Sequence, residues 1–118
     1  MMPPGLRVIR EPITREELAA IADATFGDMV KGVVDLERGV MAVGGEMHSD
    51  EETALLDDGS RQEHLWGINL YPASSGDDFI EFDSMINVRP RAGNPSRSVV
   101  DPAVRAEITA LVARLVQP

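Results

Sequence analysis

Runs of alternating hydrophobic and polar residues, interrupted by helix-like spacings, divide the chain into eight predicted elements. We predict five strands, at residues 6–10, 29–37, 40–48, 65–71 and 79–89, and three helices, at residues 14–26, 51–56 and 102–117. Thr14 with Glu17 has the spacing of a capping box, and Asp101 supplies an N-cap acceptor just before a proline. The loops Glu37–Gly39 and Pro72–Asp78 favour β-hairpins.

The order of these elements predicts an α+β fold. In this prediction a mostly antiparallel sheet of about five strands has two long helices packed on one face, and its other face is open or covered by a partner. Because 118 residues suffice for one hydrophobic core and no repeat or long linker interrupts them, we expect a single globular domain over residues 1–118. Gly44 and Gly45, late in the third strand, predict either a tight bend or room for a ligand lying across the sheet.

Strand alternation separates an apolar face of the sheet from a polar face, because side chains at i, i+2 and i+4 point the same way. The apolar face is predicted to carry Trp66, Ile68, Leu70, Ile80, Phe82 and Ile86. If the strands are neighbours, the polar face gathers Glu46, His48, Asn69, Glu81, Asp83, Asn87 and Arg89. These seven residues are the candidate binding residues, together with Arg97 from the stretch that follows.

Two interpretations of this polar face remain open. Solvent-exposed faces of antiparallel sheets are ordinarily polar, and Arg89 near Glu81 or Asp83 fits common cross-strand ion pairs. Alternatively, an excess of oxygen donors with one imidazole suits a divalent cation, with Glu46, His48, Glu81 and Asp83 as its ligands. A divalent metal is the cofactor that this second interpretation requires, and the sequence indicates no other.

Charge is unevenly distributed along the chain. Eleven basic and twenty acidic residues give a formal charge of −9 and a pI near 4.5, which disfavours nucleic acid and acidic membranes as partners. Residues 89–118 nevertheless carry five basic and two acidic groups. Within them, Arg89, Arg91 and Arg97 lie in a stretch without acids that can bind an oxyanion, or can instead serve the protein's own acidic surface.

The residue types present limit the cellular compartment and the catalytic chemistry that we expect. The chain has no cysteine, which excludes disulfides and cysteine nucleophiles. No apolar stretch approaches the roughly 18 residues of a membrane span, and residues 1–10 lack the features of a secretory signal, so we expect a cytoplasmic protein. His48 and His64 are the two candidate imidazole bases, and no serine lies in a Gly-x-Ser-x-Gly turn, so a Ser–His triad is not expected.

Four stretches carry a resemblance, namely Gly27–Lys31, Val40–His48, Leu65–Pro72 and Ile80–Pro90. On these residues the chain resembles a family of short bacterial proteins classed as a domain of unknown function. The resemblance covers nearly the whole chain. It implies a single bacterial domain, with no assigned activity, cofactor or catalytic residue to carry over.

Two hypotheses about function follow from the sequence. The first is a small cytoplasmic binding or protein-interaction domain with an acidic open sheet face, whose partner is an unknown protein or a second copy, because the catalytic inventory is thin. The second is a divalent-metal-dependent hydrolase of a small anionic substrate. In that hypothesis the four candidate ligands hold the metal, and Arg89 or Arg97 holds the substrate's negative charge.

Overall fold

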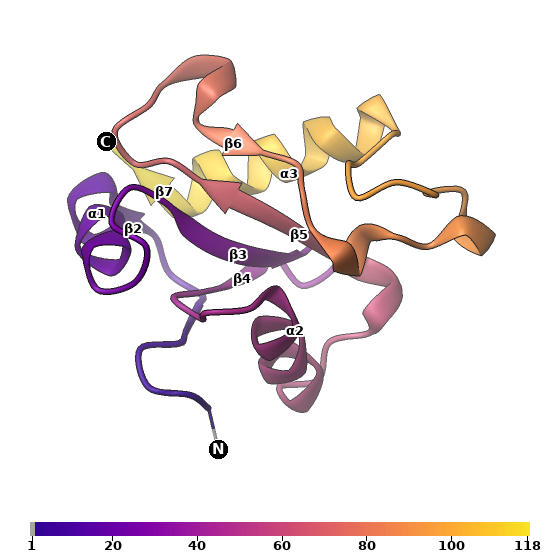
Figure 1. Cartoon of the computed structure of the whole chain (residues 1–118), viewed down its shortest axis with the longest axis horizontal. Coiled ribbons are helices and arrows are strands. Elements are labelled where there is room, and N and C mark those ends of the chain that lie inside the picture. Colours follow the sequence, from indigo (N-terminus) through magenta and orange to yellow (C-terminus); the bar gives the residue numbers. More distant parts are fainter. Residues whose placement is uncertain (1) are drawn as a thin grey trace.

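Five strands form one antiparallel sheet, in the order β1-β4-β3-β5-β6, in the computed structural model, which describes residues 2–118 (Figure 1). The strands are β1 (Arg7–Ile9), β3 (Val30–Asp35), β4 (Val40–Val43), β5 (Leu65–Leu70) and β6 (Ile80–Glu81). The helices are α1 (Arg15–Asp23), α2 (His48–Asp57) and α3 (Pro102–Leu115). The predicted α+β class is therefore confirmed. A two-stranded parallel pair that was not predicted, β2 (Ile13–Thr14) with β7 (Val116–Gln117), ties the start of α1 to the end of α3.

Local side-chain bonds set the ends of several elements. The capping box of α1 is present, because Thr14 accepts from the Glu17 N–H and the Glu17 side chain returns to the Thr14 N–H. Asp101 caps α3 through the Ala103 N–H, with Pro102 in the first turn. Buried Asp35 closes the β3–β4 hairpin. Its Oδ1 accepts hydrogen bonds from the backbone N–H groups of Glu37 and Arg38, each at 2.9 Å.

The larger of two hydrophobic clusters lies on one side of the sheet. Residues of α1 and α3 pack there with alternate residues of β3, β4 and β5. Its sheet members include Val30, Val34, Met41, Val43, Ile68 and Leu70, and its helix members include Leu18, Ala22, Ile108, Leu111, Val112 and Leu115. Alternation along β4 and β5 thus placed Met41, Val43 and Ile68 on the correct side.

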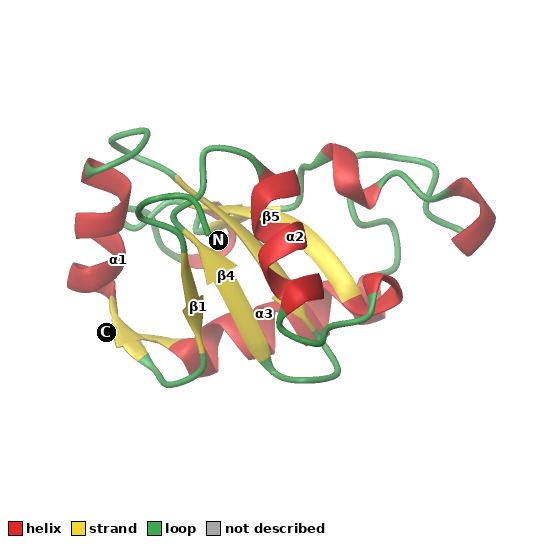
Figure 2. Cartoon of the chain, turned by 90° about the horizontal axis from the view of Figure 1, so that it is seen from below, coloured by secondary structure: helices red, strands yellow, loops and turns green. Residues whose placement is uncertain are grey.

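The opposite side of the sheet is not the open acidic face that alternation predicted. Helix α2 lies on that side, across the sheet from α3 (Figure 2). Ala54 and Leu55 of α2 pack against Val33, Ala42 and Leu65 in a second hydrophobic cluster. The prediction failed because the residues of β4 on this side are themselves apolar and need a cover, which the chain supplies from its own α2.

Strand β4 is shorter than predicted, and its end determines where α2 begins. Gly44 adopts φ +86°, and a Cβ at this position would overlap the carbonyl oxygen of Gly5. A Cβ on Gly45 would lie 2.9 Å from Cγ of Glu51. Of the two interpretations of this glycine pair, the tight bend is the one observed. Glu46 and His48 therefore lie outside the sheet, and His48 opens α2.

The last predicted strand, residues 79–89, is also wrong beyond Glu81. Ser84 accepts a hydrogen bond from the Ile86 N–H and caps a short 3-10 turn, Met85–Asn87, where the ladder would have continued. Ile80 and Phe82 pack against the larger cluster as predicted, whereas Ile86 packs against the smaller one on the other side. Residues 82–98 run as an irregular segment across the α2 side of the sheet, and we refer to them as the 82–98 segment.

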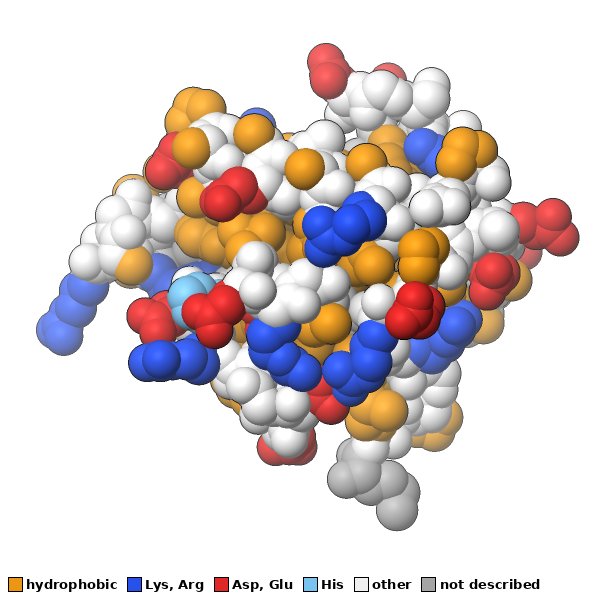
Figure 3. Space-filling view, turned by 180° about the vertical axis from the view of Figure 1, so that it is seen from behind, with side chains coloured by type: hydrophobic (Ala, Val, Ile, Leu, Met, Phe, Trp, Pro, Cys, Tyr) orange, Lys and Arg blue, Asp and Glu red, His pale blue; other side chains and the backbone are white. Residues whose placement is uncertain are grey.

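The surface carries both signs of charge. On the face seen from behind, acidic and basic side chains are interspersed among exposed hydrophobic atoms (Figure 3). This mixture shows no broad field of one sign on that face. Within residues 2–118, none of the helices is both long enough and apolar enough to cross a membrane.

Candidate functional site

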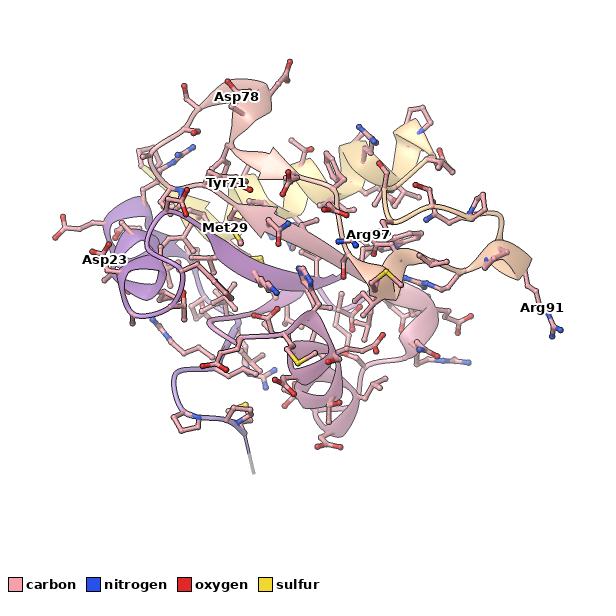
Figure 4. All side chains as sticks on the ribbon, viewed as in Figure 1. Asp23, Met29, Tyr71, Asp78, Arg91 and Arg97 are labelled. Atoms are coloured by element: carbon pink, nitrogen blue, oxygen red, sulfur yellow. The ribbon has the colours of Figure 1, made fainter. Side chains whose placement is uncertain are left out.

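A pocket of about 240 Å³ opens where the start of α2 meets the 82–98 segment. We call it the His48 pocket; its polar lining includes Lys31, His48, Ser49, Asn69, Asp83 and Arg97. Two methionines, Met47 and Met85, also line it and are 57% and 64% exposed. Arg97 points inward over the sheet, whereas Arg91 of the same segment projects away from the body of the protein (Figure 4). The pocket thus joins side chains from two strands, one helix and one irregular segment.

His48 is the first residue of α2 and is half-buried. Its Nε2 lies 2.8 Å from the carbonyl oxygen of Ile68, which can only accept, so Nε2 donates and Nδ1 carries the lone pair of the neutral ring. Burial lowers the pKa of His48, the Ile68 carbonyl offsets part of that effect, and nearby Lys31 lowers the pKa further. The side chains of Asn69 and Asp83 act in the opposite direction. His48 is therefore a neutral base at pH 7.

Asn69 and Glu81 face each other across β5 and β6. The register pairs them directly, and Asn69 Nδ2 donates to Glu81 Oε1 at 2.8 Å and to the Asp83 carbonyl at 3.3 Å. Tyr71 donates its hydroxyl to the same Glu81 oxygen at 3.0 Å. Asn69 is only 6% exposed, and its Oδ1 has no hydrogen-bond partner among residues 2–118. A buried acceptor without a hydrogen-bond partner destabilises the folded state, so a purely structural role does not account for Asn69.

Two positive side chains stand on either side of the pocket. Arg97 Nε lies 2.8 Å from Asp83 Oδ1, and both side chains of this pair are substantially exposed. Lys31 occupies β3 directly opposite Asn69, and within the described part of the chain it forms no ion pair. Its ammonium lies 5.1 Å from the ring centroid of Phe26. One carboxylate at the pocket is therefore already neutralised, and one ammonium is not.

Four of the eight predicted candidate residues do not line the pocket, namely Glu46, Glu81, Asn87 and Arg89. Glu81 lies next to Asn69, to which it is bonded. Glu46 is exposed and lines a different hollow beside Arg7 and α1. Asn87 is fully buried and bonds to both the N–H and the carbonyl of Gly67, at 2.8 and 2.9 Å. Arg89 lies 4.3 Å from the ring centroid of Trp66 and donates to the carbonyl of Leu65. The side chains of Asn87 and Arg89 bind backbone groups of β5, so both residues have a structural role.

Asparagine side chains fasten the 82–98 segment. Besides its two bonds to Gly67, Asn87 donates to the Arg97 carbonyl at 3.0 Å. Asn94 Nδ2 lies within 3.0 Å of three backbone carbonyls, and its Oδ1 accepts from the Val100 N–H. These bonds replace the missing ladder, because each buried backbone group still needs a partner. They fix the positions of Asp83 and Arg97 relative to the sheet.

Glu51, one helical turn after His48, is completely buried. Its Oε2 accepts from the Gly45 N–H at 3.0 Å, and its Oε1 has no partner in the described residues. Burial raises the pKa of Glu51 to about 9, although the Gly45 N–H and Lys31 partly counteract it. At neutral pH Glu51 is therefore an uncharged carboxylic acid beneath the start of α2.

The structure does not gather the four residues predicted as metal ligands into one group in the described part of the chain. Among residues 2–118, no group of three or more His, Cys, Asp or Glu side chains is close enough to hold a metal ion. Glu81 and Asp83 are instead bonded to Asn69 and Arg97, and Glu46 lies at another hollow. The four candidate ligands were grouped on the assumption that residues 40–48 and 79–89 are continuous strands, and both strands end early.

Sequence reasoning missed several residues of the site. Lys31 could have been found, because it is a charged residue in the apolar strand Val30–Asp35 and alternates with Val30 to the α2 side. Glu51 lies four residues before buried Leu55, which places both on the same side of α2. Met47, Ser49 and Met85 gave no such signal, since their places depend on where α2 and the 3-10 turn begin.

The chain was compared with protein families, curated proteins and solved structures. The family model described as "Protein of unknown function (DUF5674)" matches residues 7–115, which span the whole sheet, all three helices and the His48 pocket. No curated protein matches significantly, and no solved structure does. Because this family model matches nearly the whole chain, the chain belongs to the DUF5674 family.

Proposed function

We propose that this protein is a small binding domain whose ligand is a small molecule held in the His48 pocket. The observation that carries the proposal is the convergence of Lys31, His48, Asn69, Asp83 and Arg97 on one pocket. They come from β3, α2, β5 and the 82–98 segment, which are far apart in the sequence. Small-molecule sites typically combine an apolar wall with a few convergent polar groups.

The two exposed methionines support a small organic ligand. Met47 and Met85 are among the most exposed large hydrophobic side chains of the described residues, and both line this pocket. Flexible thioethers adapt to the apolar part of a ligand at little strain. The polar groups would then orient the ligand, while Met47 and Met85 would cover its carbon skeleton.

The rest of the fold serves as a scaffold in this proposal. Residues of α1 and α3 belong to the larger hydrophobic cluster on one side of the sheet, and α2 and the 82–98 segment carry the site on the other. We place the protein in the cytoplasm, as the sequence predicts. Anchoring by packed strands keeps a site more precise than loops alone would.

A thermal-shift screen of a small-metabolite collection tests the proposal. A ligand that binds the folded state stabilises it by RT ln(1 + [L]/Kd), which is about 2.7 kcal/mol at a hundredfold excess over Kd. Ser49 is exposed and lines the pocket, so Ser49→Trp should fill the pocket and abolish the shift. At least one compound should raise the melting temperature of the wild type and not that of this variant.

Thr53→Trp is the matched control. Thr53 is exposed on the same helix but lines a different hollow, so this variant should respond to the ligand like the wild type. The proposal is wrong if no compound stabilises the wild type. It is equally wrong if every stabilising compound acts on Ser49→Trp as strongly as on the wild type.

A further inference from the structure

We infer that the ligand of the His48 pocket carries an oxyanion, a carboxylate or a phosphate group, which binds at the N-terminus of α2 between Lys31 and Arg97, and that His48 takes up a proton when it binds. This inference rests on the proposed function and names the chemical class of the ligand. Three features of the pocket lead to it: backbone N–H donors, positive side chains, and the unpartnered side-chain oxygen of Asn69 near His48.

The backbone donors come from the first turn of α2. The first N–H groups of a helix have no partner inside the helix, and the helix dipole adds partial positive charge there. Met47 at the N-cap forms no side-chain cap bond within the described chain, unlike Thr14 and Asp101 in the other two helices. Met47, His48 and Ser49 all line the pocket, so these donors lie beside the space where a ligand would bind.

The positive side chains complete the charge balance. Lys31 is without an ion pair among residues 2–118, and Arg97 can turn part of its guanidinium to a ligand because only its Nε is bonded to Asp83. Among the described residues, Asp83 is the one carboxylate that lines the pocket. Lys31, Arg97 and the helix terminus therefore outweigh Asp83, and the pocket can hold an anion despite the formal charge of −9 on the chain.

The buried amide of Asn69 is the independent sign of a ligand-dependent state. Its Oδ1 is unpartnered in the described structure, and the Asn69 side chain favours the protonated form of the neighbouring His48 ring. The neutral ring leaves this acceptor unused, whereas an imidazolium has a second N–H to donate. An anion in the pocket supplies the charge that stabilises the imidazolium, so binding and proton uptake are linked.

The other charged groups around His48 set the direction of this linkage. Lys31 of β3 opposes protonation of His48, and Asp83 of the 82–98 segment favours it. Arg97 of that segment is paired with Asp83, and Glu51 on the same helix is uncharged at neutral pH. Asp50 and Glu52 follow on α2 itself and are partly exposed. An entering anion offsets Lys31, so its affinity should rise as the pH falls from 8 to 6.

Matched pairs of acids and amides test the charge requirement. Acetate, lactate and succinate are titrated calorimetrically against acetamide, lactamide and succinamide, with inorganic phosphate as the second source of oxyanion. At least one acid or phosphate should bind, and its amide partner should bind at least about tenfold more weakly, as expected when a charge-assisted bond is lost. Binding should shift the backbone amide resonances of His48 and Ser49.

Three charge variants assign the binding to the pocket. Lys31→Gln and Arg97→Gln should each lower the affinity for the oxyanion by about tenfold to a hundredfold. Arg91→Gln removes the same charge from the exposed tip of the 82–98 segment and should leave the affinity unchanged. Equal binding of acid and amide, or equal affinity of all three variants and the wild type, would overturn the inference.

The proton is tested with a carboxylate ligand, which stays ionised between pH 6 and 8. Wild-type affinity should increase at pH 6 relative to pH 8, and His48→Gln should bind equally at both. A pH-independent wild-type affinity contradicts the proton uptake. If the metabolite screen yields a ligand blocked by Ser49→Trp but no oxyanion binds, the inference fails while the proposed function stands; if nothing binds, both fail.

Discussion

Glu51 is the residue whose chemistry departs most from its ordinary behaviour. A carboxyl group that is buried beside one N–H donor is stable only with its proton, which is why its pKa rises to about 9. The tight bend at Gly44–Gly45 leaves room for it, since any side chain on Gly45 would meet Glu51. The folded protein therefore binds one proton here that the unfolded chain releases near the ordinary pKa of a glutamate.

This proton makes folding stability depend on pH. Between the ordinary pKa of a glutamate, about 4.5, and about 9, the folded state holds more protons than the unfolded state, so stability falls as the pH rises. Between pH 7 and 8, above the ordinary pKa of histidine, the slope should approach about 1.4 kcal/mol per pH unit, and Glu51→Gln should remove it and be the more stable protein at pH 8. Urea denaturation at pH 5, 6, 7 and 8 measures both effects.

Glu52→Gln is the control for this experiment. Glu52 is the next residue on α2 and is partly exposed, so its substitution should keep the wild-type slope. A wild-type protein whose stability is flat between pH 7 and 8 would show that Glu51 is ionised in the fold. His48 acts in the opposite direction below its ordinary pKa, because its lowered pKa costs stability as the pH falls.

Some of the site could be predicted residue by residue. Alternation along two strands placed Asn69 and Glu81 on the same side, and the register pairs them directly. The same rule failed for Glu46 and His48, because the left-handed glycine at position 44 interrupts the strand. The alternation of polar and apolar residues does not show at which residue a strand ends. The ends of these strands determine which polar residues lie close together.

At the scale of elements, the 82–98 segment shows why alternation was misleading. Its first half alternates like a strand, yet it bonds through side chains of Ser84, Asn87 and Asn94 instead of through a ladder. Asparagine and serine bond to nearby backbone groups as readily as they sit in strands, so the pattern alone could not distinguish the two. Helix α3 was predictable because its cap, its proline and its apolar positions all agree.

Gly67 allows the 82–98 segment to lie directly on β5. A Cβ on Gly67 would stand 2.5 Å from Cβ of Ser84, so Gly67→Ala should push the segment away and cost about 1–3 kcal/mol in unfolding free energy. Amide hydrogen exchange should accelerate at residues 84–98. Ligand affinity in the His48 pocket should fall with it, because Asp83 and Arg97 lose their fixed positions.

Gly32→Ala is the matched control on the neighbouring strand. Gly32 is also buried, but a Cβ there would meet its nearest neighbours at 3.6 Å, an ordinary contact distance. This variant should keep both the exchange pattern and the affinity. If the two variants lose the same stability and show the same exchange, the close approach of Ser84 to Gly67 is not what holds the segment.

On the scale of the whole molecule, one sheet separates two hydrophobic clusters with different roles. The larger cluster joins α1 and α3 to the sheet, and the smaller cluster holds α2, whose first residues line the pocket. Because both clusters share β3, β4 and β5, they should unfold together in a chain of 118 residues. Ligand affinity, by contrast, depends on the geometry of the α2 side alone.

Two truncations separate stability from binding. Leu111→Ala removes a side chain that is 4% exposed in the larger cluster, and Leu55→Ala removes a fully buried one beneath α2. Each should lower the unfolding free energy by about 2–5 kcal/mol, in a single transition that fluorescence and circular dichroism report alike. Under conditions where both variants are folded, Leu55→Ala should lower the affinity for the ligand of the His48 pocket, and Leu111→Ala should leave it unchanged. Two separate transitions, or loss of binding in folded Leu111→Ala, would show that the two sides of the sheet are not divided in this way.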